Sequence, residues 1–165
     1  MLEIRWHSRA GQGAVTGAKG LADVVAKTGK EVQAFAFYGS AKRGAAMTAY
    51  NRIDSDVILN HEKFMRPDYI FVIDPSLPFI TDISQNAKDD TKYIITTHLS
   101  KEEFLAKKPD LQGKEVYVLD CIKISQDTIG RAIPNTPMLG AFIKVSGMFE
   151  LGFFQEAMKK VLGKK

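Results

Sequence analysis

The distribution of hydrophobic and polar residues at the start of the chain predicts two strands joined by a helix. Leu2–His7 alternates apolar and polar residues, as a strand with one buried face does. After a glycine-rich turn, Ala14–Lys27 carries an apolar stripe at helical spacing, and Glu31–Phe37 has the apolar content of a second strand. The chain therefore opens as a Rossmann-like βαβ unit, for which we expect a right-handed crossover.

The central part of the chain contains short extended segments. Ala45–Ile53 and Val57–Leu59 flank the polar turn Asp54–Asp56, and this arrangement predicts a hairpin. Tyr69–Asp74 is a short apolar run, typical of a strand buried on both faces. The segments that follow are predicted strands at Lys92–Thr97 and Glu115–Asp120 and predicted helices at Lys101–Lys107, Cys121–Arg131 and Phe153–Leu162.

A further helix is predicted near the C-terminus. Asn135-Thr136-Pro137 has the composition of a helix start, in which a side chain caps the helix just before a proline in its first turn. The residues that follow give this helix one broad apolar face, formed by Met138, Leu139, Phe142, Val145 and Phe149.

Together these elements indicate one domain over residues 1–165. No internal repeat or linker-like tract divides the chain, and its length suits one compact unit. Strands that alternate with helices are typical of a three-layer α/β/α fold with a mainly parallel sheet. The predicted hairpin would add one antiparallel pair and make the sheet mixed.

The composition narrows the class of protein. Hydrophobic residues make up 45% of the chain and charged residues 25%, as in ordinary soluble proteins. The longest apolar stretches, such as Met138–Val145, are too short to span a bilayer, and the first nine residues lack the apolar core of a signal peptide. We therefore expect a cytoplasmic protein that does not enter the membrane.

The cysteine and histidine content argues against a metal centre. The single cysteine, Cys121, excludes an internal disulfide and a four-thiolate iron–sulfur cluster held by this chain alone. His7, His61 and His98 are scattered, without a neighbour at metal-ligand spacing. We expect no metal ligand among these residues.

The net charge of +4 is small, and several basic residues lie at the C-terminus. Such a balance attracts nucleic acid or an anionic cofactor in some proteins, but a solvated helix face with a basic tail explains it more simply. The chain has no recognition-helix or aromatic–basic RNA motif. We therefore do not expect a nucleic-acid partner.

The glycine loop between the first strand and the first helix is the most informative short motif. Gly11 and Gly13 allow a close approach of the backbone to a ligand, and the helix start that follows favours an anionic group. Arg9 would add a charged contact, and Gln12 completes the loop. The alternative is a tight turn that only permits close packing, and the two interpretations carry equal weight.

The same loop does not match a dinucleotide-binding fingerprint. Thr16 stands where the third glycine is expected, although Gly17 comes one residue later. The second strand ends in Phe35-Ala36-Phe37-Tyr38, without an acidic residue to hold a ribose hydroxyl. Binding of NAD is therefore disfavoured.

A second loop, Tyr38–Gly44, follows the second strand and contains Lys42 and Arg43. In an open parallel sheet, the loops after the strands gather at one edge, where ligands usually bind. We expect Lys42 and Arg43 to share an edge with Gly11–Gly13 and to suit a phosphate. Ordinary surface cations are the alternative interpretation.

No complete catalytic constellation stands out. Ser8 and Ser40 lack a nucleophile elbow, and Cys121 resembles a small buried hydrophobic residue more than a nucleophile. Asp74 and Asp120 close predicted strands, where they either touch a ligand or complete a turn. The chain therefore resembles part of a catalyst and not a catalyst by itself.

Several segments, in the same order along the chain, resemble the gamma subunit family of pyruvate and related 2-oxoacid:ferredoxin oxidoreductases. Ile4–Val15 is similar to the strand, glycine loop and helix that open the family's sequences. Ala34–Gly39 with Arg43-Gly44 resembles its aromatic-glycine and arginine-glycine loop. Asn135–Ala141 resembles its Asn-Thr-x-x-Leu-Gly helix start, and Asp74–Leu77 fits the middle of the pattern.

The resemblance implies an enzyme that converts pyruvate, coenzyme A and oxidised ferredoxin to acetyl-CoA, carbon dioxide and reduced ferredoxin. It implies alpha, beta and delta partner subunits that carry thiamine diphosphate, magnesium and iron–sulfur clusters, with ferredoxin or flavodoxin as acceptor. No cofactor is expected on this chain alone. The edge formed by Arg9, Gly11, Gln12, Gly13, Lys42 and Arg43 would face coenzyme A. The aromatic segment Phe35–Tyr38 resembles pyruvate-type members slightly more than 2-oxoglutarate-type ones.

Two other interpretations stay open at the level of sequence. A stand-alone nucleotide-binding α/β enzyme would bind NAD, FAD or a nucleotide and lack stable partners. A non-catalytic interaction domain would bind partners, and substitution of Arg9, Lys42 or Arg43 would leave turnover unchanged.

Overall fold

The computed structural model describes residues 1–39, 44–62 and 66–162, which form one mixed sheet with helices on both faces. The six strands are ordered β2-β3-β1-β4-β5-β6. Their bounds are β1 Leu2–Arg9, β2 Glu31–Tyr38, β3 Ala46–Asp54, β4 Tyr69–Val72, β5 Lys92–Thr96 and β6 Glu115–Leu119. The helices are α1 Ala14–Ala26, α2 Leu77–Ile80, α3 Lys101–Lys107, α4 Cys121–Ile129, α5 Asn135–Ser146 and α6 Leu151–Leu162, with a 3₁₀ turn at Pro109–Leu111.

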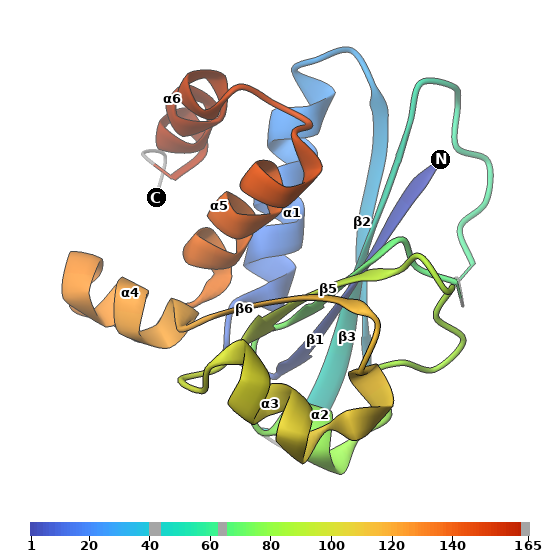
Figure 1. Ribbon diagram of the computed structural model, residues 1–165. Coiled ribbons are helices and arrows are strands. Elements are labelled where there is room, and N and C mark those ends of the chain that lie inside the picture. The colour runs from blue at the N-terminus through green and yellow to red at the C-terminus, as the bar shows by residue number, and fades with distance from the viewer. Residues whose placement is uncertain (40–43, 63–65, 163–165) are drawn as a thin grey trace.

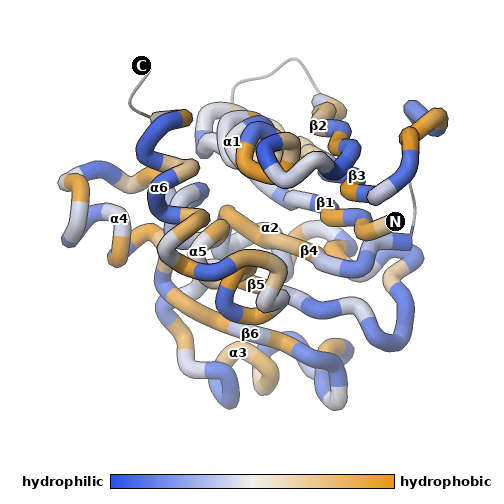
Figure 2. Tube along the Cα trace, turned by 90° about the horizontal axis from the view of Figure 1, so that it is seen from above, coloured by the Kyte–Doolittle hydropathy of each residue, from blue (hydrophilic) through white to orange (hydrophobic). Residues whose placement is uncertain are grey.

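The helices form two layers that enclose the sheet (Figure 1). On one face, α1, α5 and α6 pack on a core that includes Trp6, Phe71 and Phe142. On the other face, α2 and α3 cover β4, β5 and β6 through a second core centred on Tyr93 and Phe104. β4 and β5 are almost completely buried, as expected of strands covered on both faces. Figure 2 shows hydrophobic colour also along most of the edge strand β6, although Glu115 and Tyr117 of that strand are exposed. The predicted three-layer α/β/α fold is confirmed.

The sheet is more mixed than the sequence predicted. β1, β4, β5 and β6 are parallel, whereas β3 is antiparallel to both of its neighbours, β1 and β2. The two strands of the opening βαβ unit are therefore parallel but not adjacent, because β3 lies between them.

The predicted hairpin between Ala45–Ile53 and Val57–Leu59 is wrong. Residues 57–59 form no strand, and the side chains of Val57 and Leu59 are 71% and 83% exposed. β3 instead pairs along its length with β2, from Glu31 opposite Asp54 to Tyr38 opposite Met47. A long ladder on each side satisfies far more backbone groups than a three-residue partner would.

A buried polar link joins the centre of the sheet to α1. The indole Nε1 of Trp6 donates to Asn51 Oδ1 at 2.9 Å, and Asn51 Nδ2 donates to the carbonyl of Ala18 at 2.9 Å. All of these groups are buried, so each hydrogen bond satisfies a polar atom that water cannot reach. The link holds β1, β3 and α1 in one arrangement.

The start of α5 differs from its prediction. Asn135 is the first residue of the helix, Pro134 precedes it, and no side chain caps the turn. Asn135 Nδ2 instead donates to the carbonyl of Gly13 at 3.2 Å. Its Oδ1 accepts from the adjacent backbone N–H of Thr136 at 2.8 Å, and not from an N–H two or three residues further on, as the oxygen of a cap does.

No helix within the described part of the chain is long and apolar enough to cross a membrane.

Candidate functional site

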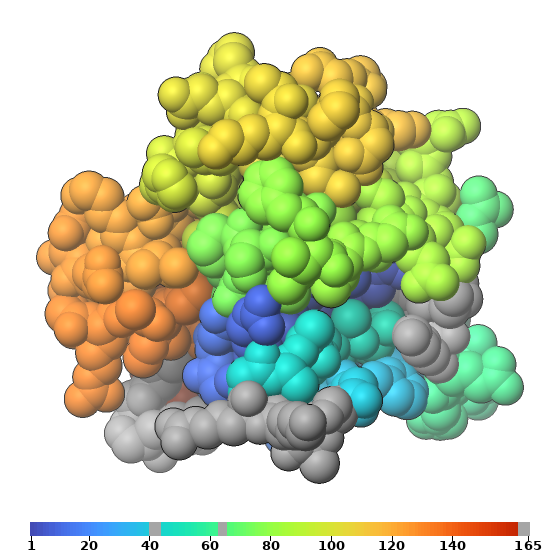
Figure 3. Space-filling model, turned by 90° about the horizontal axis from the view of Figure 1, so that it is seen from below, coloured from blue at the N-terminus to red at the C-terminus, as the bar shows by residue number. Residues whose placement is uncertain are grey.

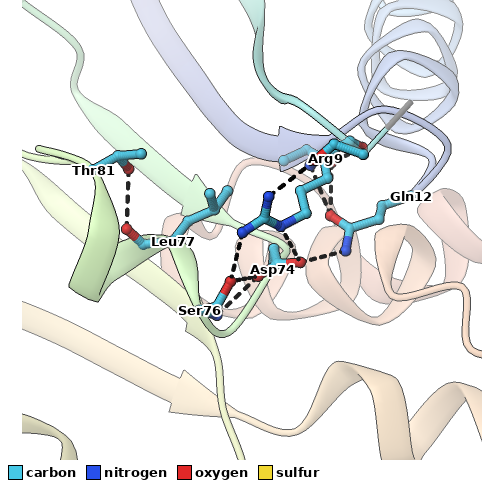
Figure 4. Close-up of polar contacts among 8 residues, drawn as sticks. Arg9, Gln12, Asp74, Ser76, Leu77 and Thr81 are labelled. Atoms are coloured by element: carbon cyan, nitrogen blue, oxygen red, sulfur yellow. Dashed lines mark hydrogen bonds and ion pairs between the residues drawn. The ribbon is translucent and has the colours of Figure 1, made fainter. Parts of the chain in front are cut away.

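The carboxyl ends of β1 and β4 bring together the glycine loop and the segment before α2 (Figure 4). Arg9 is the last residue of β1, and Gln12 follows in the loop. Asp74 and Ser76 lie just after β4. Because parallel neighbours end at the same edge of a sheet, residues more than 60 positions apart meet here.

Arg9 connects three loops through its guanidinium group. Nε lies 3.3 Å from Asp74 Oδ2, Nη2 donates to Ser76 Oγ at 3.1 Å, and Nη1 donates to the carbonyl of Gly44 at 2.9 Å. Gly44 stands just before β3, so Arg9 ties the end of β1 to the segments that border β3 and β4. A phosphate at this position would have to compete with Asp74 for the same cation.

Gln12 fixes the shape of the glycine loop. Its Oε1 accepts from the backbone N–H of Arg9 at 2.8 Å, and its Nε2 donates to Asp74 Oδ2 at 2.6 Å. Ser8 Oγ also donates to Gln12 Oε1 at 3.2 Å. The side-chain amide therefore joins its own loop to the segment after β4.

The carboxylate of Asp74 is held in its ionised form. Burial raises the pKa of Asp74, but hydrogen bonds from Ser76 and Gln12 and the nearby Arg9 charge outweigh it, so the pKa lies below the ordinary value of 3.8. The Ser76 backbone N–H also donates to Asp74 Oδ1 at 2.8 Å, which closes a local turn. Asp74 is thus the acceptor on which this edge converges.

The glycines of the loop have both a conformational and a packing role. Gly11 and Gly13 have φ of 91° and 90°, a region that favours glycine. A Cβ on Gly13 would lie 2.9 Å from Asn135 Nδ2, and one on Gly17 would lie 3.0 Å from the Trp6 ring. The loop therefore permits close packing of α1 against β1 and α5, which the tight-turn interpretation described.

The structure places four of the predicted site residues together. Arg9 ends β1, and Gly11, Gln12 and Gly13 follow it in the glycine loop. Lys42 and Arg43 lie outside the described residues. The second loop's described end does reach this edge, because Ala10 N donates to the carbonyl of Ala45 at 3.2 Å.

Ser76 was not among the predicted site residues. For Asp74, the sequence left open whether it touches a ligand or completes a turn at the end of a strand. The signal for it was an acidic residue directly after a buried run, with a serine two positions later. That pattern predicts a turn, but it does not identify Arg9 and Gln12 as partners.

A cleft of about 420 Å³ opens beside this network. It lies between the end of β2, the start of β3 and the segment 77–85, which are cyan and green in the view of Figure 3. The residues that line it are His7, Phe37, Tyr38, Gly39, Ala46, Met47, Thr48, Leu77, Thr81, Asp82 and Gln85. A concave surface at the carboxyl ends of strands is where open α/β sheets usually bind ligands.

His7 lines one wall of the cleft, and the buried Arg5 stands behind it. Arg5 Nε donates to His7 Nε2 at 3.1 Å, and its Nη2 donates to the carbonyls of Ile83 and Gln85, each at 3.0 Å. Burial lowers the pKa of Arg5, yet an arginine keeps its proton in proteins. The Nε2 atom of His7 is therefore the acceptor in this hydrogen bond.

The described residues do not assemble a metal centre or an activated nucleophile. No group of three or more His, Cys, Asp or Glu side chains lies at ligand distance in the described part of the chain. Cys121 is fully buried at the start of α4, and burial raises the pKa of its thiol to about 11. The interpretation of Cys121 as a small buried residue is confirmed.

Sequence comparisons relate almost the whole chain to one family. The family model described as pyruvate ferredoxin/flavodoxin oxidoreductase matches residues 3–165. The common subunit gamma of the pyruvate/ketoisovalerate oxidoreductases of Thermococcus kodakarensis is 43% identical over 160 residues, which cover 97% of this chain and 86% of the relative. The pyruvate synthase subunit PorC of Thermotoga maritima is 40% identical, and the match covers 99% and 83% of the two chains.

Solved structures agree with this relationship. The crystal structure of a pyruvate oxidoreductase subunit from Thermotoga maritima matches with a TM-score of 0.79 and 38% identity, over 99% of this chain and 84% of the other. A 2-oxoglutarate:ferredoxin oxidoreductase chain from Magnetococcus marinus matches with a TM-score of 0.57 and 15% identity, over 96% of this chain and 30% of that chain. The second match shows the shared fold alone.

Proposed function

Since the chain belongs to the pyruvate ferredoxin/flavodoxin oxidoreductase family, we propose that it is the gamma subunit of a pyruvate:ferredoxin oxidoreductase. The observation that carries this proposal is the match of residues 3–165 to the family and to relatives named as gamma subunits. One gamma-type domain then spans residues 1–165. The enzyme would convert pyruvate, coenzyme A and oxidised ferredoxin to acetyl-CoA, carbon dioxide and reduced ferredoxin.

The chemistry of the reaction would belong to partner subunits. Thiamine diphosphate supplies a carbanion for decarboxylation, and iron–sulfur clusters carry the electrons to ferredoxin or flavodoxin. The residues of this chain do not fit a cluster, because its single cysteine is buried. We therefore assign these cofactors, with magnesium, to alpha, beta and delta subunits.

The role of this chain in the enzyme would be to shape the edge at which coenzyme A enters. The described part of this edge is the glycine loop with Arg9, Gly11, Gln12 and Gly13 and the cleft beside it. Lys42 and Arg43, which lie outside the described residues, are predicted from the sequence to share it. Because Arg9 already binds Asp74, its role is to hold the loops in place. Lys42 and Arg43 would then supply the charge for the phosphates of coenzyme A.

The assembly is tested by purification from native cells. The tagged chain, isolated without oxygen, should bring down larger subunits coloured by iron–sulfur clusters. The eluate should reduce a viologen dye in the presence of pyruvate and coenzyme A, and a panel of 2-oxoacids would rank the substrates. A chain that elutes alone and inactive under gentle conditions would overturn the assignment as a subunit.

The coenzyme A edge is tested separately, in the assembled enzyme. Arg43→Ala should raise the apparent KM for coenzyme A by about tenfold, as the loss of one charged phosphate contact would, and leave the KM for pyruvate unchanged. Lys159→Ala, on α6 at the opposite end of the molecule, is the control and should change neither value (Figure 1). An unchanged KM for coenzyme A in the Arg43 variant would remove Arg43 from the site without affecting the assignment as a subunit.

A further inference from the structure

The outermost strand on one side of the sheet, β2, has the composition of an internal strand. β2 is an edge strand in the order of the described sheet, and it has eight residues, compared with five in the other edge strand, β6. After Glu31 it contains no charged residue and no proline, the features with which edge strands usually avoid association. Its residues are apolar on both faces, apart from Gln33.

Neither face of β2 is fully covered. All residues from Val32 to Ala36 are half-buried, while Phe37 and Tyr38 are 44% and 62% exposed. A groove of about 250 Å³ runs between α1 and this strand. It is lined by Val15, Ala18, Lys19, Ala34, Phe35, Ala36 and Tyr38. The apolar surface thus continues from the strand onto the neighbouring helix.

We propose that β2 pairs with β2 of a second copy of this chain, antiparallel about a two-fold axis, to form a continuous twelve-stranded sheet. This inference goes beyond the proposed function and does not depend on it, because it uses the backbone edge of β2. The strand shares only its last residues, Phe37 and Tyr38, with the lining of the cleft. The open backbone groups of an edge strand favour such pairing, and a two-fold axis closes the assembly at two copies.

The side chains of β2 suit pairing with themselves. If Phe35 lies on the axis, Phe35 faces its own copy, Ala34 faces Ala36, and Val32 faces Tyr38. Aromatic–aromatic and aromatic–β-branched pairs are favourable across strands. The small Ala34 and Ala36 lie on the face toward α1, where they leave room for the helices of the two copies to approach.

Charges on α1 complement one another under the same symmetry. Lys19 and Asp23 are both exposed and lie one turn apart on α1, which packs on β2 and β3. The axis would place the α1 helices of the two copies antiparallel on the same face of the sheet. Lys19 of one copy would then lie opposite Asp23 of the other, twice in each dimer. This self-complementarity favours a second copy over an unrelated strand.

In analytical ultracentrifugation, the isolated full chain at about 50 µM and moderate salt should sediment as a dimer. Ala36→Lys should raise the dissociation constant of this dimer at least about tenfold, because the substitution brings a charge into the interface. Tyr117→Lys on the other edge strand, β6, is the matched control and should leave the dimer intact. Circular dichroism would confirm that each variant is folded. A monomeric wild-type chain, or a dimer that Ala36→Lys leaves unchanged, would overturn the proposal.

The charge pairing and the register have their own tests. Lys19→Glu and Asp23→Lys should each weaken the dimer, and the double variant should restore it. Single cysteines placed in turn at positions 33–37 should cross-link most strongly at the residue on the axis, since Cys121 is buried and does not compete. Equal or absent cross-linking along the strand would contradict the antiparallel pairing even if a dimer forms by another surface.

Discussion

At the scale of single residues, charged and polar side chains at the carboxyl ends of β1 and β4 hold the neighbouring loops together through hydrogen bonds and an ion pair. Arg9 places its guanidinium against Asp74, Ser76 and the carbonyl of Gly44, and Gln12 adds a second link to Asp74. Arg9 and Gln12, two of the residues that the sequence patterns associate with a phosphate, are therefore engaged within the fold. Their positions could be predicted from the glycine motif. Their partners could not, because Asp74 is 62 residues away from Gln12 and only the pairing of β1 with β4 brings it close.

The replacement Asp74→Asn should reduce the free energy of unfolding at pH 7 by about 1–3 kcal/mol, because Arg9 and Gln12 lose a charged acceptor. Since the pKa of Asp74 is lowered in the folded state, its contribution is present above the ordinary value of 3.8 and is lost as the pH falls through the folded-state pKa. The difference between the two proteins should therefore shrink below about pH 4. Urea unfolding as a function of pH measures this.

Asp127→Asn serves as the control for this experiment. Asp127 pairs with Lys123 on the surface of α4, where both side chains are more than half exposed. Exposed pairs of this kind contribute little to stability. If Asp127→Asn lowers the free energy of unfolding as much as Asp74→Asn does, or if the loss in the Asp74 variant does not depend on pH, the network around Asp74 does not have the assigned role.

At the scale of elements, glycines let helix α1 pack closely against β1 and α5. Gly17 faces the ring of Trp6 on β1, and Gly13 faces Asn135 at the start of α5. The sequence predicted α1 within one residue and α3 with the bounds observed, because the apolar periodicity of a helix is a local signal. It did not predict which strands flank β3, since the partner of a strand depends on contacts that its own pattern does not contain.

Two glycines of α1 should respond in opposite directions to the same change. Gly17→Ala would place a Cβ 3.0 Å from Trp6 and 3.2 Å from Asn135 Cβ, and should cost about 1–3 kcal/mol of unfolding free energy. Gly20→Ala would meet only the end of Met158 at 3.7 Å, and should stabilise the helix by about 0.5–1 kcal/mol. Thermal and chemical unfolding of both variants measure the difference, and equal effects would rule out the close packing as its cause.

At the scale of the whole molecule, the two cores meet the same sheet from opposite sides, and Cys121 belongs to the larger of them. It stands at the start of α4 and is completely buried. The position after a strand was readable from the sequence, and burial followed from the residue's small apolar character. The exposure of α4 and the course of residues 55–62 could not be predicted from the sequence, because they depend on how the layers assemble.

The thiol of Cys121 should report the opening of the entire domain. Its pKa of about 11 and its burial should make labelling of the native chain at pH 8 at least about 100-fold slower than labelling of the unfolded chain. Mass spectrometry of the reaction with iodoacetamide, with and without urea, measures both rates. Rapid labelling of the native chain would show that the α4 region opens independently of the rest.

The central place of β1 also has a consequence for the order of events during synthesis. The first strand of the chain is complete after nine residues, but its two neighbours end only at Asp54 and Val72. β2 and β3 are close in sequence and can pair early, whereas β1 must wait for partners on both sides, and such non-local pairing is slow. On the ribosome, the backbone of β1 should therefore lack its full set of hydrogen bonds until β4 has left the exit tunnel. The segment that is synthesised first is thus among the last to be paired on both sides.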